Sequence, residues 1–438
     1  MSSHASMWNP EREALPREEL RALQGERLRE QVKHVYRNSS FFEELYDDHG
    51  VHPNEIRGRE DVEKLPVFDK DDLREYRDRT GDFWCGALCV PESEVGRATQ
   101  STGTTGKPNY FGLTDRDHDH VGEIFARQMY AWGFRKGDKF NQMGTAHWNG
   151  TVMALDEAAR QIGVTPVNGI FGAQNIAEII FGLQTEADFD GVLVYQPETE
   201  LEFIEENDID PTEVFPNVRF IFSMVDASQP KRELWEETWG VPFYNGYASG
   251  DQFFTSYECG HDGQYCHVPE DKFLVEVLDP ETGEHVEPGE YGEVHITNLW
   301  AEANPYIRYR LEDLVDYKVG ECDCGRTTMR IRPLGRLSWS VEVEGRERPV
   351  TNIEVEEVIW GFDELMGENY QIVKRKPGEQ SELVARVATE ADIGSDTRDD
   401  AEAALSDEFG VPAELIVTTS DAIGLESATK MERVAEEY

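Results

Sequence analysis

Residues 101–108 read Ser-Thr-Gly-Thr-Thr-Gly-Lys-Pro, a run of hydroxyls and glycines with a single lysine. Two glycines permit tight backbone turns whose N–H groups can face an anion, and the hydroxyls add further donors. Lys107 adds a point charge that suits a phosphate. The run is no P-loop of the G-x-x-x-x-G-K-[ST] type, because Ser101 replaces the first glycine and Pro108 the last hydroxyl. It indicates a phosphate-holding loop of another kind, and a plain polar surface turn is the alternative.

The length of the chain and its apolar segments limit the kinds of protein that it can be. A chain of 438 residues is long enough for two or three domains and a large core. It has no apolar run of about 18 residues, so it predicts no membrane span. Residues 1–20 lack the apolar stretch of a secretory signal peptide. These features indicate an enzyme-sized cytoplasmic protein.

The charge balance is extreme. The chain has 88 Asp and Glu against 42 Lys and Arg, a formal net charge of −46, and the acidic residues are spread along its length. A uniform acidic coat is typical of a protein that stays soluble in a salt-rich cytoplasm, where a Debye length of about 3 Å at 1 M salt screens self-repulsion. An ordinary acidic protein is the alternative. Nucleic-acid binding is excluded as a function class because it needs a basic face.

Apolar runs that alternate with helical segments predict an α/β fold. Helical spacing predicts helices within 10–50, short helices around loops in 53–75, and helices at 118–135 and 153–162. Strands are predicted at 191–195, 218–224, 273–278 and 292–298, and near 341–344, 370–374, 382–388 and 414–418. Residues 270–340 are rich in strands and turns, and the acidic stretch 389–402 is expected to be a solvated helix or loop.

Several segments together resemble the phenylacetate–CoA ligases, a family of the AMP-forming adenylating superfamily of acyl-CoA synthetases. They are WNPEREALPREEL (8–20), LPVFDKDDLR (65–74), STGTTGKP (101–108), NPYIRYRLEDL (304–314), Gly335-Arg336, and Lys430 in ATKMERV. The resemblance spans nearly the whole chain. It implies a large N-terminal α/β adenylation domain with a β-rich subdomain, residues 1–337, and a small mobile C-terminal α+β domain, residues 338–438.

The same resemblance implies a set of site residues. The nucleotide would be held by Ser101, Thr102, Gly103, Thr104, Thr105, Gly106, Lys107, Tyr247, Asp251, Asp313 and Arg336. Lys430, Lys107 and Asp251 would act in catalysis, with Asp251 binding Mg²⁺ and Asp313 accepting hydrogen bonds from the ribose hydroxyls. His147 and Trp148 would close an acyl pocket suited to a flat apolar acid. The implied reaction forms an acyl-adenylate from a carboxylic acid and ATP, then a thioester with CoA.

The chain departs from the family pattern at several of these places. The usual Tyr-Gly-x-Ser-Glu is Tyr-Ala-Ser-Gly-Asp at 247–251, and Glu312 stands where a glycine is usual. Ser338-Trp339 replaces Asp-Asp after Arg336, and the residues before Lys430 also differ. Two other functions therefore remain open: an adenylyltransferase acting on a deazaflavin coenzyme, and a non-catalytic nucleotide-binding protein. The sequence does not determine the oligomeric state, although a homodimer is common among relatives.

Cysteine and histidine gather in two separated clusters. Cys259-Gly-His261 and Cys266-His267 are followed by Cys322-x-Cys324, the usual layout of a structural zinc site. By resemblance to some phenylacetate–CoA ligase relatives, the ligands would be Cys259, His267, Cys322 and Cys324, with Cys266 and His261 as rivals for the first two places. Reduced cysteines without a metal are the alternative. The remaining two, Cys85 and Cys89, are expected to be buried thiols.

Overall fold

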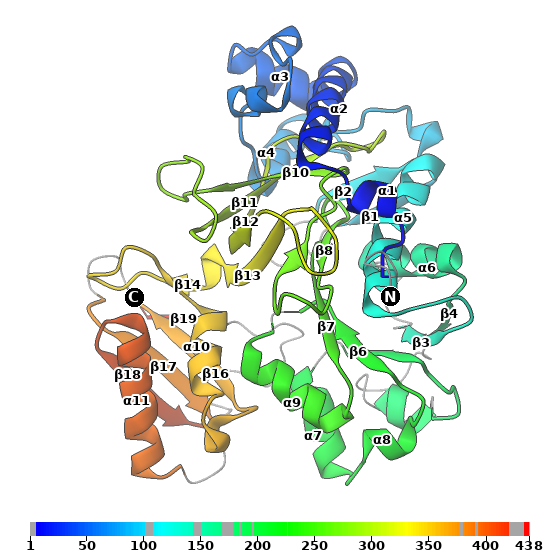
Figure 1. Cartoon of the computed structure of the whole chain (residues 1–438). Coiled ribbons are helices and arrows are strands. Elements are labelled where there is room, and N and C mark those ends of the chain that lie inside the picture. Colours follow the sequence, from blue (N-terminus) through cyan, green and yellow to red (C-terminus); the bar gives the residue numbers. More distant parts are fainter. Residues whose placement is uncertain are drawn as a thin grey trace. The chain divides into compact units, whose positions relative to one another are not determined.

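The computed structural model separates into two compact units (Figure 1). It describes residues 6–100, 108–142, 150–168, 178–183, 185–194, 197–225, 227–375, 380–389, 393–419 and 433–437. The first unit comprises residues up to Val225, Trp239–Leu311 and Asp316–Arg332. The second comprises Asp226–Thr238, Glu312–Val315 and the chain from Pro333 onward. The domain boundary predicted at 337/338 stays a prediction.

The N-terminal region is helical, as the sequence indicates. The helical pattern of 10–50 is divided at Pro16, which precedes the second helix, and at Ser39, whose side chain accepts a hydrogen bond from Phe42 N. The helix at Lys70–Thr80 starts with a capping box between Asp69 and Asp72. The elements are α1 (Pro10–Glu13), α2 (Arg17–Asn38), α3 (Ser40–Asp48), η1 (Pro53–Glu55), η2 (Arg59–Lys64), α4 (Lys70–Thr80) and η3 (Glu92–Glu94).

One half of the central sheet is parallel. Strands β3 to β7 pair in the order β4-β3-β5-β6-β7, all parallel, which requires crossover segments between them. The strands are β3 (Lys139–Gln142), β4 (Thr165–Asn168), β5 (Gly191–Leu193), β6 (Phe220–Ser223) and β7 (Phe243–Ser249). The accompanying helices are α5 (Asp115–Trp132), α6 (Gly150–Ile162), η4 (Glu178–Leu183), α7 (Pro197–Glu206), α8 (Pro211–Val214) and α9 (Gln229–Trp239).

The other half of the sheet continues with antiparallel strands. β7 pairs antiparallel with β8, so the sheet changes character next to the loop that carries Asp251. The full order is β10-β11-β12-β13-β9-β8-β7-β6-β5-β3-β4. The added strands are β8 (Phe254–Tyr257), β9 (Cys266–His267), β10 (Phe273–Leu278), β11 (Tyr291–Asn298), β12 (Tyr309–Lys318) and β13 (Arg330–Arg336). A separate hairpin joins β1 (Arg97–Gln100) to β2 (Tyr110–Leu113).

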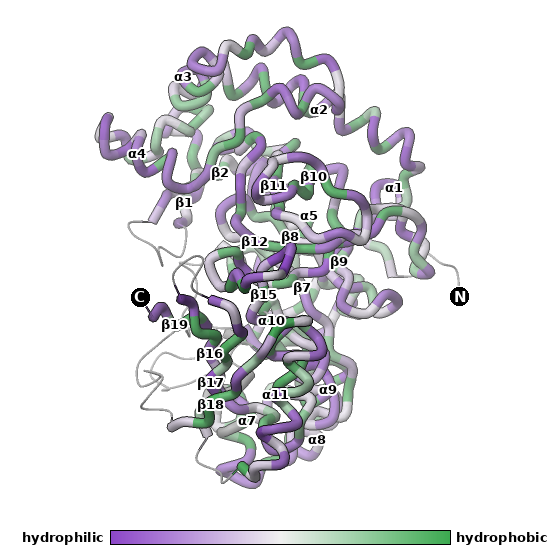
Figure 2. The backbone as a smooth tube through the Cα atoms, turned by 90° about the vertical axis from the view of Figure 1, so that its left-hand side faces the viewer, coloured by the Kyte–Doolittle hydropathy of each residue, from purple (hydrophilic) through white to green (hydrophobic). Residues whose placement is uncertain are grey.

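The second unit is built on a four-stranded sheet of order β18-β17-β16-β19. Its strands are β16 (Asn369–Lys374), β17 (Leu383–Ala388), β18 (Ala413–Thr418) and β19 (Val434–Glu436). It also holds η5 (Leu337–Trp339), β14 (Ser340–Val341), β15 (Val350–Thr351), α10 (Asn352–Ile359), η6 (Asp363–Leu365) and α11 (Ser395–Phe409). Its core buries Trp360, Tyr370 and Leu405 among aliphatic side chains, and β16 and β17 carry much of the hydrophobic colour in Figure 2.

Most of α9 belongs to this second unit, and a buried ion pair connects it to α10. Lys231 Nζ lies 3.0 Å from Glu356 Oε2, and both side chains are only 3% exposed. The same ammonium lies 4.9 Å from the centroid of the Trp360 ring. Removing one member of such a pair would leave an uncompensated buried charge, so α9 is firmly joined to α10.

The predicted α/β architecture is confirmed, with a large mixed sheet and a second, smaller α+β unit. The strand predicted at 273–278 coincides with β10, and the one at 292–298 lies within β11. In the acidic stretch the structure describes a helix, α11, which extends beyond the predicted range and buries Ala401, Leu405 and Phe409. Among the described residues, none of the helices is both long and apolar enough to cross a membrane.

Candidate active site and metal centre

Asp251 lies in the turn between β7 and β8, where the sheet passes from parallel to antiparallel strands. Its carboxylate Oδ2 accepts a hydrogen bond of 2.9 Å from the hydroxyl of Tyr309, at the start of β12. Tyr309 is buried, and burial together with the charge of Asp251 raises the pKa of its phenol well above the usual value. The phenol therefore stays protonated and fixes one oxygen of the carboxylate.

Gln252 ties the turn to the segment that precedes β12. Its Nε2 donates to the carbonyls of Asp251 at 2.8 Å and Asn304 at 3.2 Å, and its Oε1 accepts from the backbone N–H of Tyr306. The side chain of Asn304 continues the connection, because it accepts from Gly112 N and donates to Ala87 O. All these groups are buried, so the position of Asp251 is set by a satisfied polar network.

Two residues flanking this network have left-handed backbones. Phe253 has φ of 52° and Arg308 has φ of 62°, a conformation that is costly for side chains other than glycine. Arg308 is held in it by hydrogen bonds to Glu276 and to the carbonyl of Leu65 at 2.8 Å. Strained backbone kept in place by buried contacts is a feature of functional sites.

Asp313 and Arg336, both in the second unit, are paired. Arg336 Nε lies 3.3 Å from Asp313 Oδ1, and its guanidinium stacks 5.6 Å from the Trp339 ring centroid. Gly335 precedes Arg336 with φ of 114°, and a Cβ there would meet Asn352 Oδ1 at 2.4 Å. Glu312, which stands where relatives have glycine, has φ of 62°. A positive φ is the conformation that glycine adopts without strain, which explains why glycine is usual at this position.

The remaining predicted active-site residues divide into two groups. Tyr247 lies in β7, opposite Ser256 of β8, with its ring 5.9 Å from that of Phe254. The predicted phosphate-loop residues Ser101, Thr102, Gly103, Thr104, Thr105, Gly106 and Lys107, the acyl-pocket residues His147 and Trp148, and Lys430 lie outside the described residues. Their assignments stay predictions.

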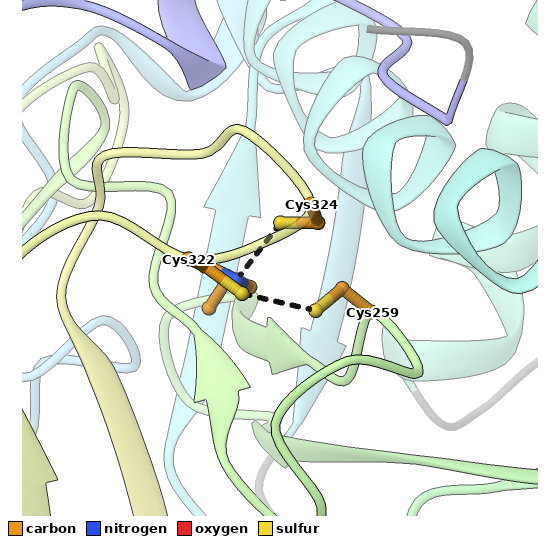
Figure 3. A group of neighbouring side chains, drawn as sticks. Cys259, Cys322 and Cys324 are labelled. Carbon is orange, nitrogen blue, oxygen red and sulfur yellow. Dashed lines mark hydrogen bonds between the residues drawn. The ribbon is translucent and has the colours of Figure 1, made fainter. Parts of the chain in front are cut away.

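The structure brings the four predicted metal ligands together. One ligand atom each from Cys259, His267, Cys322 and Cys324 lies within 4.8 Å of the others, and all four residues are buried. Figure 3 shows the three cysteines converging from two separate stretches of chain. All six cysteines are free thiols, so the cluster is not a disulfide.

The spacing of these atoms fits tetrahedral zinc. A zinc ion with Zn–S bonds of about 2.3 Å and Zn–N bonds of about 2.0 Å places two sulfurs about 3.8 Å apart and sulfur and nitrogen about 3.5 Å apart. Cys259 Sγ and Cys322 Sγ are separated by 3.7 Å, and Cys324 Sγ and His267 Nε2 by 3.4 Å. Four protein ligands would close the coordination sphere, as in a structural site.

Protonation at the cluster also favours a metal. Burial lowers the pKa of His267, so its imidazole is neutral, and Nδ1 lies 2.9 Å from Thr328 Oγ1. A proton on Nδ1 leaves Nε2 free to coordinate. A hydrogen bond from Cys259 lowers the pKa of Cys322 to about 7, and hydrogen bonds from both other thiols lower the pKa of Cys324. Hydrogen bonds with Cys322 and Cys324 raise the pKa of Cys259, so thiolates are favoured at Cys322 and Cys324 while Cys259 keeps its proton.

A second layer connects the cluster to the N-terminal segment. Arg326 is fully buried, and its Nε donates to Glu13 Oε2 at 2.8 Å while its Nη2 donates to Ser6 O. Tyr257 also donates to Glu13, and Thr327 Oγ1 donates to Leu15 O. The loop that carries two of the candidate ligands therefore holds residues 6–15 in place.

The two rival ligands point elsewhere. Cys266 and His267 are neighbours in β9, where successive side chains take opposite faces. Cys266 Sγ contacts the carbonyls of Asn245 and Gln264 at 3.9 and 3.8 Å, so His267 alone faces the cluster. His261 is exposed and its Nδ1 lies 2.9 Å from the carbonyl of Cys259. Neither rival is among the converging atoms.

Sequence reasoning missed the residues that position the site. Tyr309, Gln252 and Asn304 fix Asp251, and Arg326 with Glu13 surrounds the cluster, yet none of these was singled out. Tyr309 and Asn304 lie within the segment 304–314, and Gln252 directly follows Asp251. Their position within segment 304–314 or next to Asp251 was the sequence signal that could have identified them.

Comparison with known proteins agrees with this geometry. No protein-family model matches the sequence. The phenylacetate-coenzyme A ligase of Thermus thermophilus is 33% identical over 385 residues, which cover 87% of this chain and 84% of that protein. The phenylacetate-coenzyme A ligase of Escherichia coli is 29% identical over 377 residues, which cover 84% and 82%.

Solved structures show the same fold. A 2-hydroxyisobutyryl-CoA ligase in the postadenylation state superimposes with a TM-score of 0.85 at 20% identity, covering 100% of this chain and 94% of that one. A benzoate CoA ligase from Burkholderia xenovorans gives a TM-score of 0.56 at 15% identity, covering 78% and 68%. With 33% identity to a curated relative across most of both chains, this chain belongs to the phenylacetate–CoA ligase family, acid–thiol ligases of the adenylate-forming superfamily.

Proposed function

We propose that the chain joins an aryl carboxylic acid, of the phenylacetate type, to CoA through an acyl-adenylate made from ATP. The observation that carries this proposal is the 33% identity to the Thermus thermophilus phenylacetate-coenzyme A ligase over 87% of the chain. The geometry described above supports it, because candidate nucleotide residues from distant parts of the sequence are held by buried contacts. Adenylation of this kind depends on positioning and electrostatics, which such contacts provide.

Each candidate residue has a chemical task in this reaction. Thr102, Thr104, Thr105 and Lys107 bind the β- and γ-phosphates, and Lys430 bridges the attacking carboxylate and the α-phosphate. Asp313 accepts hydrogen bonds from the ribose hydroxyls, and the ion pair with Arg336 orients its carboxylate. Domain rotation near residue 338 then gives the CoA thiol access to the adenylate.

Mg²⁺ is held at Asp251 in this proposal. A carboxylate oxygen suits this hard cation, and when bound the ion neutralises charge on the phosphates. The Tyr309 hydroxyl and the Gln252 side chain keep the carboxylate in one orientation, which favours a fixed coordination geometry. Aspartate has one methylene fewer than the glutamate usual in the family, so this support from Tyr309 determines how far the carboxylate reaches.

Zinc is the metal we assign to the Cys259, His267, Cys322 and Cys324 cluster. Three sulfurs and one imidazole nitrogen within 4.8 Å of one another favour zinc over Mg²⁺ or Ca²⁺, which prefer oxygen ligands. With four protein ligands the ion has no open position, so its task is to hold the loop at 322–328 in shape. That loop in turn anchors residues 6–15 through Arg326.

The chain works in high salt under this proposal. A net charge of −46 repels itself and repels the polyanions ATP and CoA at low ionic strength. At multimolar salt the screening length falls to about 3 Å or less, and only groups near contact act on a ligand. The enzyme is therefore expected to bind its nucleotide best under those conditions.

The test is ATP–pyrophosphate exchange in about 2–3 M KCl, run with phenylacetate, benzoates, indole acetates, short fatty acids and no acid. Exchange that depends on one aryl acid, followed by thioester formation when CoA is added, is the expected result. Exchange without a CoA-dependent product would assign another acceptor, such as a deazaflavin coenzyme. No exchange with any acid in folded, metal-replete protein would contradict the proposal and leave a non-catalytic nucleotide-binding protein.

A further inference from the structure

Helix α2 crosses the loop before η2 at two glycines. Gly25 is buried in the middle of α2, and a Cβ there would lie 2.9 Å from Arg59 N and 3.3 Å from Gly58 Cα. Glycine in a helix interior costs about 1 kcal/mol relative to alanine, so a close approach is the reason for its presence. The crossing brings the backbone of residues 57–60 directly against α2.

Arginines flank this crossing on both elements. On α2 the spacing of four puts Arg17, Arg21, Gly25 and Arg29 in one row along the helix. On the loop Arg57 and Arg59 lie on either side of Gly58. Helix and loop therefore direct five guanidinium groups to one place, and Figure 2 shows α2 largely in the hydrophilic colour.

These residues line a groove of about 770 Å³, a volume typical of small-molecule sites. Its lining is Arg17, Glu18, Arg21, Ala22, Gly25, Glu26, Arg29, Arg57, Gly58, Arg59 and Glu60. Five arginines against three glutamates give a local excess of positive charge. A chain with 88 acidic and 42 basic residues does not reach such an excess in one groove by average composition.

The arginines fall into an anchored pair and an available set. Arg17 pairs with Glu270, and Arg59 Nε donates to Gln24 Oε1 at 3.0 Å. Arg21, Arg29 and Arg57 make no ion pair or side-chain hydrogen bond within the described part of the chain. The three guanidinium groups thus keep their full donor capacity for a ligand.

The arginines of the groove lie close enough to repel one another. Burial lowers the pKa of Arg59 most, Arg21 and Arg17 lower it as well, and Glu270 and Glu276 oppose the shift. The three lining glutamates are exposed and form no ion pair with these arginines among the described residues. An anion seated between the guanidinium groups would relieve this repulsion.

We propose that the groove between α2 and residues 57–60 binds a small, multiply charged phosphate compound, either an inorganic oligophosphate or a phosphate ester. Arginine is the residue suited to this task, because its planar fork donates two parallel hydrogen bonds to phosphate oxygens. In multimolar salt the distant acidic coat is screened, whereas contact hydrogen bonds from several guanidinium groups persist. The site uses none of the residues assigned to adenylation.

The concave shape favours a small molecule over an acidic protein surface. A groove of this volume can hold a ligand with two phosphates, and Gly25 lets the backbone of the loop approach α2 closely. A protein partner would instead need a broad contact surface of at least about 1,000 Å² in total. An acidic polypeptide is therefore one of the outcomes that the test separates.

Titration calorimetry on the full-length protein tests the proposal, at one fixed KCl concentration. The probes are inorganic pyrophosphate, fructose 1,6-bisphosphate as a phosphate ester, and a poly-glutamate peptide. The variant Arg21→Gln/Arg57→Gln removes two available guanidinium groups, and Arg37→Gln, further along α2 and outside the groove lining, is the matched control. Because Arg21 and Arg57 are exposed, the thermal unfolding midpoint is expected to stay unchanged.

One of the two phosphate probes is expected to bind wild type and the Arg37→Gln control alike, and to bind the double variant at least about tenfold more weakly. If pyrophosphate is the probe whose binding weakens, the ligand is an oligophosphate; if it is fructose 1,6-bisphosphate, the ligand is a phosphate ester. Pyrophosphate is also a product of the proposed reaction, so it could bind at the catalytic site as well. Two results separate the groove from that site. Fructose 1,6-bisphosphate is not a reactant, and the double variant should keep the wild-type KM for pyrophosphate in the exchange assay. Isotherms that superimpose for wild type and double variant would overturn the proposal.

Two further outcomes are decisive. Tight binding of poly-glutamate in the groove, with neither phosphate probe bound, would replace the small-molecule ligand with an acidic partner and overturn the proposal. Should the double variant fail to fold, Arg57→Lys serves instead, because it retains the charge and loses the bidentate fork. A severalfold loss of phosphate affinity in that variant is expected, and unchanged affinity counts against the site.

Discussion

The hydroxyl of Tyr309, at the start of β12, donates a hydrogen bond of 2.9 Å to Oδ2 of Asp251, in the turn that follows β7. Tyr309 is buried and its pKa is raised, so near neutral pH the phenol stays protonated and is always the hydrogen-bond donor to the carboxylate. The carboxylate proposed to hold Mg²⁺ thus has a fixed second partner. This relationship makes Tyr309 a positioning residue whose effect acts through Asp251.

Tyr309→Phe is expected to reduce adenylation about tenfold at limiting Mg²⁺. The ring remains to fill its buried site, while Asp251 loses the donor that orients it. Exchange rates measured over a range of Mg²⁺ concentrations should show a raised metal requirement and partial recovery at saturation. Tyr317→Phe is the control, because Tyr317 lies in the same strand and its hydroxyl donates to the carbonyl of Val286. Equal Mg²⁺ dependence in both variants would count against the role of Tyr309.

Removal of the candidate zinc ligand Cys324 is expected to abolish metal binding and lower stability. Cys324→Ser should purify without zinc by elemental analysis, whereas wild type carries one equivalent per chain. Its thermal midpoint should fall by several degrees, because the metal organises the loop at 322–328. Cys266→Ser, which alters a thiol outside the cluster, should retain the metal. Zinc-free wild-type protein with an unchanged midpoint is the contrary result.

Gly335→Ala is expected to destabilise the second unit by more than about 2 kcal/mol. An alanine there has an unfavourable φ of 114° and also places its Cβ 2.4 Å from Asn352 Oδ1. Gly345→Ala is the matched control, since φ is 92° and nothing lies within 4 Å of the added carbon. Thermal unfolding of both variants separates the backbone cost from the clash. Similar losses in the two would show that Asn352 moves aside freely.

Acid is expected to destabilise the chain in part through His120. Burial lowers the pKa of His120 to about 4, with Lys272 adding to the shift, and Lys272 Nζ donates to its neutral Nδ1 at 2.9 Å. The unfolded chain binds a proton at a pKa of about 6.5, so this contribution is complete above 6.5 and is lost as pH falls toward 4. His120→Gln should therefore flatten the decline of the unfolding midpoint across that window, while the exposed His49→Gln should not. If the unfolding midpoints of wild type, His120→Gln and His49→Gln fall in parallel as the pH is lowered, His120 makes no such contribution.

Low salt is expected to unfold or expand the protein. With a net charge of −46, the unfolding midpoint should fall steadily as KCl is lowered from about 3 M to about 0.1 M. Calorimetry and small-angle scattering at each concentration measure stability and compactness. A midpoint that does not change with KCl would identify an ordinary acidic protein.

The cluster of candidate metal ligands was predictable because its residue types are rare and their spacing is restrictive. One Cys-x-Cys pair, on a chain with only six cysteines, leaves few ways to arrange four soft ligands. The choice between Cys266 and His267 followed from family resemblance, and its physical basis is structural: they are neighbours in β9 and take opposite faces. Periodicity alone does not identify a two-residue strand.

The polar network around Asp251 was not predictable from the sequence. Tyr309, Gln252 and Asn304 are common residue types whose importance comes from the atoms they meet. Tyr309 meets Asp251, and Gln252 meets Asn304, across more than 50 positions of sequence. The strands at 273–278 and 292–298 were found because continuous apolar runs carry a local signal. Long-range hydrogen bonds leave no such local pattern.

The contact between Glu13 and Arg326 sets an order of events during synthesis. The two residues are 313 positions apart, so Glu13 leaves the ribosome long before its guanidinium partner exists. At about 5–20 residues per second, the interval is roughly 15–60 s. Throughout that time Glu13 lacks its guanidinium partner, although Asn9 and Trp8 can already meet Glu123 and Tyr130 of α5. The N-terminal segment therefore gains its last buried contact only once residues 322–328 have emerged.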